Sequence, residues 1–252
     1  MARAAIRGRL TWLLGEVTAL VEEVPGVRSI ELQVPGWPGH LPGQHVDVRL
    51  TAEDGYQAQR SYSIATPADG ERLTLTVERL PDGEISTYLV DELRAGDEFE
   101  LRGPIGGYFV WTPDHGGPLL LLAAGSGLVP LMAMVRHRAG SGDATPIRLL
   151  LSSRSWEQVI YRAELERLGG AANGVEIVHT LTRTQPPDWT GYRRRVDAEM
   201  LAEVAQAPAE QPLCFVCGPT GFVESVASAL VELGHEPRRV KTERFGPTGG
   251  DL

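Results

Sequence analysis

An apolar run, Leu119–Ala123, leads into the glycine-rich segment Gly125–Pro130. A run without polar alternation predicts a strand that is buried on both faces, as in a parallel sheet. Pro130 falls near the first turn of the next segment, where proline costs a helix no hydrogen bond. The pattern therefore predicts a strand, a tight turn and a helix, and the free N–H groups at the start of this helix can hold a phosphate group.

The sequence pattern changes between Pro113 and Pro118. Before this point, short apolar runs alternate with Gly, Pro and Asp turn signals, which favours an antiparallel barrel. Expected here are strands over 17–24, 29–34, 45–50, 61–64, 73–77 and 99–101, and a helix over 86–93 capped by Ser86. After this point strands and helices alternate, which favours a doubly wound parallel sheet. Expected here are strands over 119–123, 147–151, 175–180 and 213–217, and helices over 129–137, 157–168, 198–205 and 222–233. We expect two domains, residues 1–113 and 117–252.

The composition narrows the choice of partners and compartment. The net charge of −9 argues against nucleic acid or an anionic membrane as a partner. No segment has the ~20 apolar residues that span a bilayer. Arg3, Arg7 and Arg9 precede the apolar stretch 10–14, but Gly15 ends that stretch too soon for a signal peptide. We expect a first strand here, no membrane insertion and a cytoplasmic location.

The chain has two cysteines, Cys214 and Cys217. Two are too few for a disulfide framework, a zinc quartet or a plant-type iron–sulfur cluster, which needs four cysteinates. Their spacing is that of a redox dithiol, but both lie in an expected strand. Residues three apart in a strand point to opposite faces. We therefore expect neither a dithiol pair nor a metal site.

Two segments of the barrel half carry candidate binding residues. In the expected strand with Ser61 and Ser63, Arg60 and Tyr62 share one face. An arginine and a tyrosine in this arrangement can hold a phosphate and stack on a flat ring. Further along, Gly83–Ser86 opens the expected helix, and a glycine turn at a helix start is an anion site. An ordinary exposed strand and a purely structural cap are the alternatives.

Together with Cys217–Pro219, these segments resemble the ferredoxin–NADP reductase superfamily over nearly the whole chain. The family's loop is Gly-x-Gly-x-x-Pro, as in Gly125–Pro130, whereas the dehydrogenase fingerprint has a third glycine at the position of Pro130. The resemblance implies an N-terminal antiparallel β-barrel that binds FAD. It also implies a C-terminal α/β doubly wound parallel sheet that binds NADP(H) or NAD(H).

The resemblance also implies roles for individual residues. Arg60 would pair with the FAD pyrophosphate, Tyr62 would pack beside the isoalloxazine, and Ser63 would bond near the hydride-accepting nitrogen. Cys217 would lie close to the nicotinamide carbon that gives up hydride. The implied catalytic residues are Ser63, Cys217, Glu243 and Phe245, because a tail acid or aromatic lies by the flavin in related modules. The implied cofactor-binding residues are Arg60, Ser61, Tyr62, Ser63, Thr76, Val77, Gly83, Ile85, Ser86, Gly125, Ser126, Gly127, Pro130, Ser153, Arg154, Tyr161, Cys217, Gly218 and Pro219.

The segment after the second strand of the parallel sheet bears on coenzyme choice. In the family this strand end meets the adenosine ribose, and members that use NADP commonly have Ser and Arg, as in Ser153-Arg154. Arginine suits a phosphate contact, whereas strict NAD use favours an acidic residue. NADPH is therefore favoured over NADH. Thr182-Arg183 and Arg193–Arg195 would add phosphate contacts, and a solvated charge run is the alternative.

The resemblance predicts a reductase that passes hydride from NAD(P)H to bound FAD and then single electrons to a separate acceptor. The acceptor would be a ferredoxin, an oxygenase, a molybdenum enzyme or a haem protein. Some related modules continue into an iron–sulfur domain, and none is expected here, where the sequence ends at Leu252. Two alternatives stay open: a diffusible flavin reductase, and a non-catalytic electron-transfer subunit of a larger complex.

Overall fold

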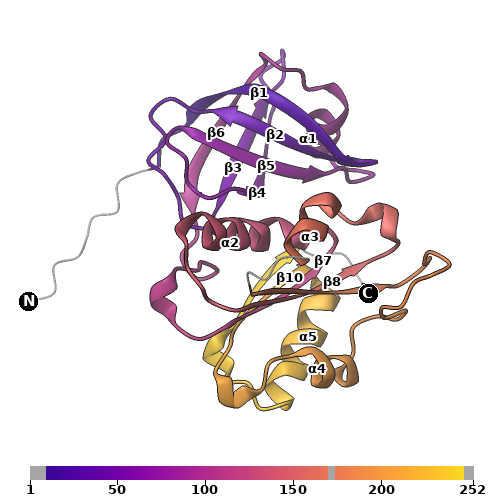
Figure 1. The fold of residues 1–252 in the computed structure, drawn as a ribbon. Helices are drawn as coiled ribbons and strands as arrows, with labels where there is room; N and C mark the ends of the chain where they lie inside the picture. Colours follow the sequence, from indigo (N-terminus) through magenta and orange to yellow (C-terminus); the bar gives the residue numbers. More distant parts are fainter. Residues whose placement is uncertain (1–9, 170–173, 247–252) are drawn as a thin grey trace, which may run out of the picture.

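The computed structural model describes residues 10–169 and 174–246, which form two stacked domains (Figure 1). The N-terminal domain is an antiparallel barrel, and the C-terminal domain is a parallel sheet with helices on both faces. This confirms the fold class expected from the sequence. Arg3, Arg7 and Arg9, and the end of the chain at Leu252, lie outside the described residues. Within the described ranges, no helix is both long and apolar enough to cross a membrane.

The barrel is one six-stranded antiparallel sheet in the order β4-β3-β6-β1-β2-β5. Its strands are β1 (Leu13–Val24), β2 (Val27–Gln33), β3 (His45–Thr51), β4 (Gln57–Ser63), β5 (Arg72–Glu78) and β6 (Glu98–Ile105). The outermost strands of this sheet, β4 and β5, meet at a bridge between Ile64 and Leu75, which closes the barrel. Alternate side chains point inward, so Ile30, Val48 and Leu101 are fully buried.

The helical segment of the barrel begins earlier than expected. It consists of α1 (Glu84–Thr87), followed directly by a π-helical turn η1 (Tyr88–Glu92). The expectation that Ser86 is the N-cap is wrong, because Gly83 occupies that position. Ser86 lies in the first turn, where its Oγ donates to the Gly83 carbonyl at 3.1 Å and accepts from Leu80 N–H at 3.1 Å. A Cβ at position 83 would collide with this hydroxyl.

The second domain is a five-stranded parallel sheet in the order β11-β10-β7-β8-β9. Its strands are β7 (Leu119–Ala124), β8 (Ile147–Ser153), β9 (Val175–Leu181), β10 (Leu213–Pro219) and β11 (Val240–Phe245). Its helices are α2 (Leu128–Ser141), α3 (Arg162–Gly169), α4 (Ala198–Val204) and α5 (Thr220–Glu232). Short 3-10 turns are η2 (Pro113–His115), η3 (Gly125–Gly127), η4 (Trp156–Gln158), η5 (Pro208–Glu210) and η6 (Pro237–Arg239).

The helices cover both faces of the parallel sheet. Helices α2 and α3 lie between the sheet and the barrel, and α4 and α5 cover the far face (Figure 1). Side chains of β7 alternate between the two cores: Leu119 and Leu121 pack on the α2 side, and Leu120 and Leu122 pack on the α5 side. This double burial explains the unbroken apolar run in the sequence.

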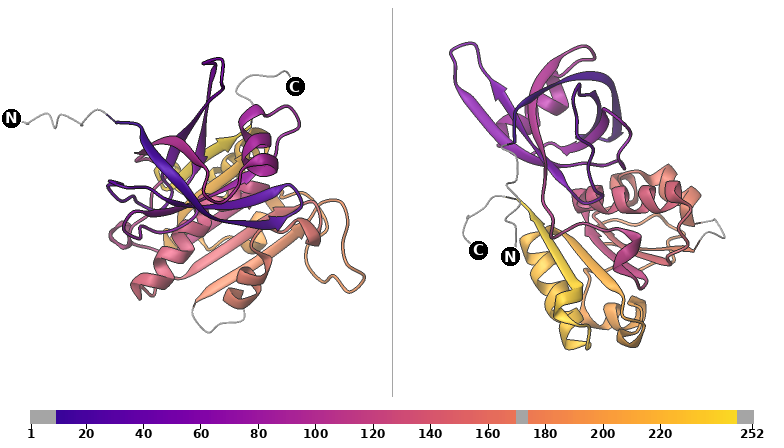
Figure 2. Two further views of the ribbon diagram at one scale, coloured as in Figure 1. Left: turned by 90° about the horizontal axis from the view of Figure 1, so that it is seen from above. Right: turned by 90° about the vertical axis from the view of Figure 1, so that its left-hand side faces the viewer.

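Two expectations about this domain are corrected. The tail expected over 243–247 is corrected: residues 243–245 belong to the edge strand β11, which pairs in parallel with β10, and Pro247 lies outside the described residues. This strand reaches the boundary between the domains (Figure 2, right). The helix expected over 157–168 is interrupted, because Tyr161 has the left-handed value φ +57° and α3 begins only at Arg162. A left-handed residue does not continue a right-handed helix.

Candidate functional site

The parallel sheet has a topological switch point between β7 and β10. From β7 the chain moves to β8 on one side, and it returns later to β10 on the other side. Ligands of such sheets bind beyond the carboxyl ends of the strands at this point. A cleft of about 1220 Å³ opens there, between the sheet and the barrel. We call it the interdomain cleft; its lining includes Val24–Val27, Glu78–Leu80, Ala124–Ser126, Ser152–Arg154 and Gly218–Phe222.

Two glycines shape the turn at the floor of this cleft. Gly125 has φ +55°, and a Cβ there would lie 3.9 Å from Oε2 of Glu78 in the barrel. At Gly127 a Cβ would overlap the backbone carbonyl of Cys217. Glycine at position 127 therefore lets β10 approach the turn closely, and glycine at position 125 suits the left-handed backbone of the turn. The N–H groups of such a turn, at the start of α2, suit a pyrophosphate.

Three of the predicted catalytic residues converge where the domains meet. Oγ of Ser63, at the end of β4, donates to Oε1 of Glu243 in β11 at 3.3 Å. Cys217 is the register partner of Glu243 across β10 and β11. We call these three residues the junction site. The fourth, Phe245, lies two residues beyond Glu243, lines the interdomain cleft and packs against the α2-side core.

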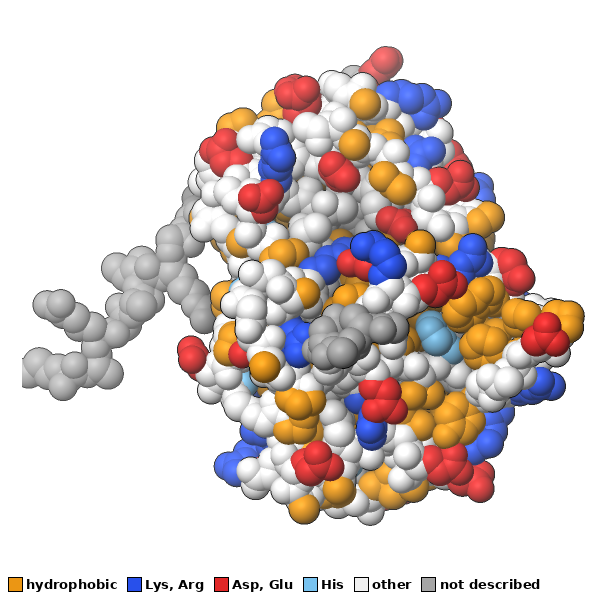
Figure 3. Space-filling view, viewed as in Figure 1, with side chains coloured by type: hydrophobic (Ala, Val, Ile, Leu, Met, Phe, Trp, Pro, Cys, Tyr) orange, Lys and Arg blue, Asp and Glu red, His pale blue; other side chains and the backbone are white. Residues whose placement is uncertain are grey.

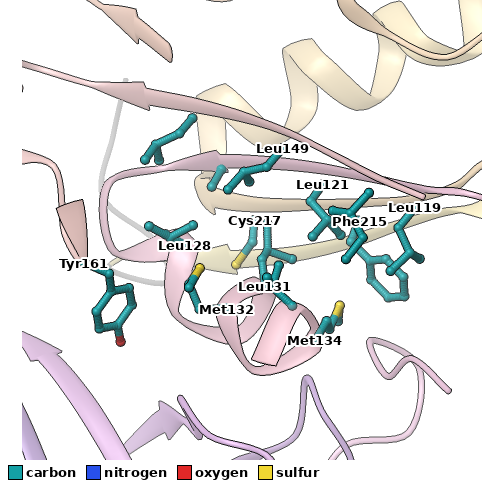
Figure 4. Packing of buried hydrophobic residues seen from close by; sticks show 14 of the residues in the cluster. Leu119, Leu121, Leu128, Leu131, Met132, Met134, Leu149, Tyr161, Phe215 and Cys217 are labelled. Atoms are coloured by element: carbon teal, nitrogen blue, oxygen red, sulfur yellow. The ribbon is translucent and has the colours of Figure 1, made fainter. Parts of the chain in front are cut away.

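Burial sets the protonation states at the junction site. It raises the pKa of the Glu243 carboxyl to about 7, and the hydrogen bond from Ser63 offsets part of this effect. Burial, with a smaller contribution from Glu243, holds the pKa of the Cys217 thiol well above its usual value. Cys217 is fully buried in the same core cluster as Leu128 and Leu131 (Figure 4). It is therefore a neutral thiol, and Glu243 can exchange a proton near neutral pH.

The residues predicted to bind FAD phosphate lie together at the barrel surface. Arg60 is exposed, and its Nη1 donates to the carbonyl of Gln59 at 2.7 Å. Within the part of the chain that the structure describes, no carboxylate forms a salt bridge with it. The first turn after Gly83, with Ile85 and Ser86 buried, has no side-chain cap on its N–H groups. An exposed guanidinium without a carboxylate partner and uncapped N–H groups fit a pyrophosphate.

Tyr62 is the residue predicted to pack beside the flavin ring. It is half-buried against the barrel core, and burial raises the pKa of its phenol. The phenol is therefore neutral at any working pH. A neutral aromatic face of this kind suits a flat ring.

Four predicted binding residues have side chains that are engaged elsewhere. Ser61 Oγ donates to Oδ1 of Asp47 at 2.7 Å. Val77 is buried in the barrel core. The Tyr161 hydroxyl donates to Oγ1 of Thr76 at 2.5 Å, and both side chains are buried between the domains. The structure thus places the Tyr161 side chain at the domain interface, outside the cleft lining.

The outer part of the interdomain cleft is rich in arginine. Ser153 and the exposed residues Arg154, Arg183 and Arg195 line it. We call these three arginines the arginine rim. Basic side chains also lie along the boundary between the domains on the face shown in Figure 3. The neighbours of Arg195 point elsewhere: Arg194 pairs with Asp197 at 2.7 Å, and Arg193 donates to the carbonyl of Trp189.

Sequence reasoning missed several residues of this cleft. Glu78 and Arg79, which the resemblance implies only as part of a stretch along the flavin edge, and the turn residues Pro25 and Gly26 line it from the barrel side. Phe222 lines it from α5. Their place in the cleft was not predictable from the sequence, because only the stacking of the two domains brings them there.

Comparison with known proteins identifies both domains. Residues 21–110 match the oxidoreductase FAD-binding domain, and residues 121–228 match the oxidoreductase NAD-binding domain. The chain is 33% identical over 205 residues to NADH-cytochrome b5 reductase 1 of Aspergillus terreus, which covers 78% of this chain and 68% of that protein. It is 31% identical over 209 residues to the glycine betaine monooxygenase reductase subunit of Pseudomonas aeruginosa, which covers 82% of this chain and 56% of that protein.

Two solved structures share the fold of this chain. The Amycolatopsis cytochrome P450 reductase GcoB superposes with a TM-score of 0.82 at 26% identity, over 95% of this chain and 71% of that one. A ferredoxin NADP+ reductase from Neisseria gonorrhoeae with bound FAD and NADP has a TM-score of 0.77 at 18% identity, over 94% and 99%. The chain spans little more than half of the Pseudomonas subunit, at 56%. With both domains matched and in this order, the chain belongs to the ferredoxin–NADP reductase family of FAD- and NAD(P)-binding oxidoreductases.

Proposed function

We propose that this protein takes hydride from NADPH onto bound FAD and passes the electrons singly to a separate protein. One observation carries the proposal: Ser63 and Glu243 meet at 3.3 Å across the domain boundary, with Cys217 beside Glu243. One domain contributes Ser63 and the other contributes Cys217 and Glu243. A site built from both domains suits a reaction between a ligand of each.

The protein's own residues would hold and orient the two cofactors. When bound, FAD supplies the ring that accepts a hydride and releases single electrons. Arg60 and the N–H groups after Gly83 would hold its pyrophosphate, and Tyr62 would pack beside the ring. The turn Gly125–Gly127 would hold the coenzyme pyrophosphate at the start of α2.

The junction site would then handle the proton and the ring contact. Glu243 can hold a proton at its carboxyl oxygen near neutral pH, because burial raises its pKa to about 7. Ser63 is hydrogen-bonded to that oxygen, so its hydroxyl can relay the proton towards the barrel. Cys217, a neutral thiol buried behind the cleft-lining residue Gly218, is a small side chain that would leave room for a ring there, and it is no nucleophile.

The arginine rim supports the choice of NADPH. Arg154, Arg183 and Arg195 give this part of the cleft three guanidinium groups, which suit the 2′-phosphate that distinguishes NADPH from NADH. The relative from Aspergillus terreus is named for NADH. The coenzyme preference is therefore a separate part of the proposal, with its own test in the Discussion.

The names of relatives narrow the acceptor. They are reductases of cytochrome b5, of glycine betaine monooxygenase and of cytochrome P450. We propose an acceptor of the same kinds, a haem protein or an oxygenase component, ahead of a ferredoxin or a molybdenum enzyme. The chain's own acceptor is a separate molecule in this proposal.

Anaerobic rapid mixing tests the main proposal. The purified protein should be yellow with FAD, and NADPH should bleach its flavin absorbance in a single turnover. A haem protein such as cytochrome b5 or c should then reoxidise it in one-electron steps. Colourless protein that reduces added free flavin would show a diffusible flavin reductase. Bound flavin that neither coenzyme bleaches would show a non-catalytic subunit. Either result overturns the proposal.

A matched pair of variants tests the FAD site. Arg60→Ala removes a charge-assisted phosphate contact, so we expect FAD occupancy at limiting FAD to fall by about tenfold. Arg72→Ala removes an exposed arginine from another barrel strand and should keep full occupancy. Titration with FAD, followed by absorbance, measures both. Equal occupancy in the two variants would remove Arg60 from the site.

A further inference from the structure

Two side chains of the coenzyme domain reach across and bond to the barrel. Nη1 of Arg136, in α2, donates to the carbonyl of Ala65 at 2.7 Å. The hydroxyl of Tyr161, just before α3, donates to Oγ1 of Thr76 at 2.5 Å. Figure 4 shows the Tyr161 hydroxyl pointing away from its own domain's core towards the barrel strands. We call these four residues the interdomain latch.

The Tyr161 bond begins a directed chain of hydrogen bonds. Thr76 Oγ1 lies 2.8 Å from Ser29 Oγ, and Ser29 Oγ donates to Oε1 of Glu23 at 2.6 Å. Each hydroxyl has one hydrogen, and Ser29 donates its own to Glu23. Ser29 must therefore accept from Thr76, and Thr76 must accept from Tyr161. Such chains strengthen one another, so the chain holds Tyr161 firmly to the barrel.

Arg136 fixes the ring of Tyr161 from the other side. Its guanidinium lies 4.4 Å from the ring centroid and forms two bonds to Glu164 of α3, at 3.0 and 2.5 Å. Tyr161 has φ +57°, a conformation that L side chains rarely adopt. A residue keeps such a conformation only where its surroundings enforce it, and strain of this kind gathers at functional sites.

The latch joins the framework of one ligand site to that of the other. Ala65 lies two residues after Ser63, and Thr76 lies two residues before Glu78, which lines the cleft. On the other domain, α2 starts at the glycine turn. We propose that Tyr161 and Arg136 are positioning residues that set the approach of the coenzyme to the flavin. The inference rests on the proposed hydride transfer, and neither residue touches a reacting atom.

In this proposal the rate of hydride transfer depends on how the interdomain latch holds the two domains relative to each other, whereas the binding of each cofactor does not. A misplacement of about 1 Å far from the chemistry can slow a reaction by up to ~100-fold. For Tyr161→Phe, which removes only the hydroxyl, we expect full FAD content and flavin reduction slowed about tenfold at saturating coenzyme. The coenzyme concentration for half-maximal rate should change little.

Tyr192→Phe is the matched control. It removes a hydroxyl that donates to Glu203 at 2.6 Å on the surface of the same domain, and it should leave the rate unchanged. Thr76→Val should slow reduction like Tyr161→Phe. Thr76→Val also removes the bond to Ser29, so the double variant should be no slower than Thr76→Val alone, in which the Tyr161 bond is already lost.

Amide hydrogen exchange of the FAD-loaded protein without coenzyme gives a readout besides activity. Exchange over 72–78 and 162–169 should rise in Tyr161→Phe and not in Tyr192→Phe. Unchanged exchange and rate would overturn the inference. So would lost FAD or a lower Tm with an unchanged rate per bound flavin, because Tyr161 would then act on stability alone. If neither coenzyme reduces the flavin of the wild-type protein, the proposed function fails. The exchange comparison still tests whether the Tyr161 hydroxyl holds the two domains together.

Discussion

The junction site and the arginine rim lie at the same domain boundary but are built in opposite ways. Ser63 and Cys217 are buried, and burial moves the pKa of the third residue, Glu243. The rim consists of three exposed guanidinium groups. At the buried junction site a single contact can determine the chemistry. At the exposed rim, water and salt weaken the interaction of each charge, so several arginines share the binding of one phosphate. Changes at the junction should alter stability, pH dependence and rate, and changes at the rim should alter coenzyme choice.

The largest effect is expected behind the junction, at Gly127. A Cβ there would overlap the Cys217 carbonyl, so the turn and β10 must separate in Gly127→Ala. Overpacking of this kind costs about 2–3 kcal/mol of unfolding free energy, and reduction by coenzyme should be lost with it. Denaturant titration and single-turnover mixing measure the two effects.

Gly140→Ala is the control for this variant. A Cβ at Gly140, in α2, meets open space. Alanine is the better helix former, so stability should stay level or rise by about 0.5–1 kcal/mol. If Gly127→Ala is as stable as Gly140→Ala, the close approach of the turn and β10 does not contribute to the free energy of unfolding.

The second effect concerns Glu243, whose pKa burial raises from 4.5 to about 7. Between these pH values the folded state keeps a proton that the unfolded state has lost. Its contribution to stability is therefore full below pH 4.5 and is lost as the pH rises through 7. Allowing for partial exposure, the loss is about 2 kcal/mol.

Glu243→Gln should abolish this pH dependence. Wild type should lose stability relative to the variant between pH 5 and pH 8, as measured by denaturation at each pH. Glu232→Gln, a change at an exposed carboxyl on α5, should follow the wild-type curve. Parallel curves for wild type and Glu243→Gln would mean that the carboxyl ionises like an exposed one.

The sequence predicted the regular parts of the fold well, for a physical reason. A strand buried on both faces, such as Leu119–Ala124, reads as an unbroken apolar run whatever its neighbours are. The strand Val240–Phe245 has no such run, since it is an edge strand with Lys241, Glu243 and Arg244. Only its pairing with β10 makes it a strand, and pairing is a tertiary property.

The motifs of the site could be predicted from the sequence, but the contacts between its residues could not. The glycine turn and Cys217 carry local signals. The bond between Ser63 and Glu243 joins residues 180 positions apart, and sequence alone placed both near the flavin only through resemblance. The position of the Tyr161 side chain was not predictable for the same reason. Its hydrogen-bond partner Thr76 lies 85 positions away, and this bond holds the side chain at the domain interface, outside the cleft lining.

The third effect is at the rim. Arg154→Ala removes a charge-assisted phosphate contact, so kcat/KM for NADPH should fall about tenfold, while that for NADH should change less than about twofold. Higher salt should narrow the difference, because the contact is exposed. Arg167→Ala, an exposed arginine of α3 outside the cleft, should change neither value. Wild-type efficiency with NADH equal to or above that with NADPH would overturn the preference.

The smallest effect is at Cys217, and its neighbour along β10 supplies the comparison. The two thiols lie on opposite faces of the sheet, Cys217 in the α2-side core and Cys214 in the α5-side core. Burial raises the pKa of both thiols, that of Cys214 to about 12, so neither thiol is ionised at neutral pH.

Cys217→Ala leaves a small gap in the core behind the cleft-lining residue Gly218, so flavin reduction should slow about threefold with FAD retained. Cys214→Ala should cost about 1 kcal/mol of stability and leave the rate intact. Single-turnover mixing and denaturation separate the two outcomes: an unchanged rate in Cys217→Ala would remove its role, and a disulfide between the thiols that forms with turnover would require the sheet to open.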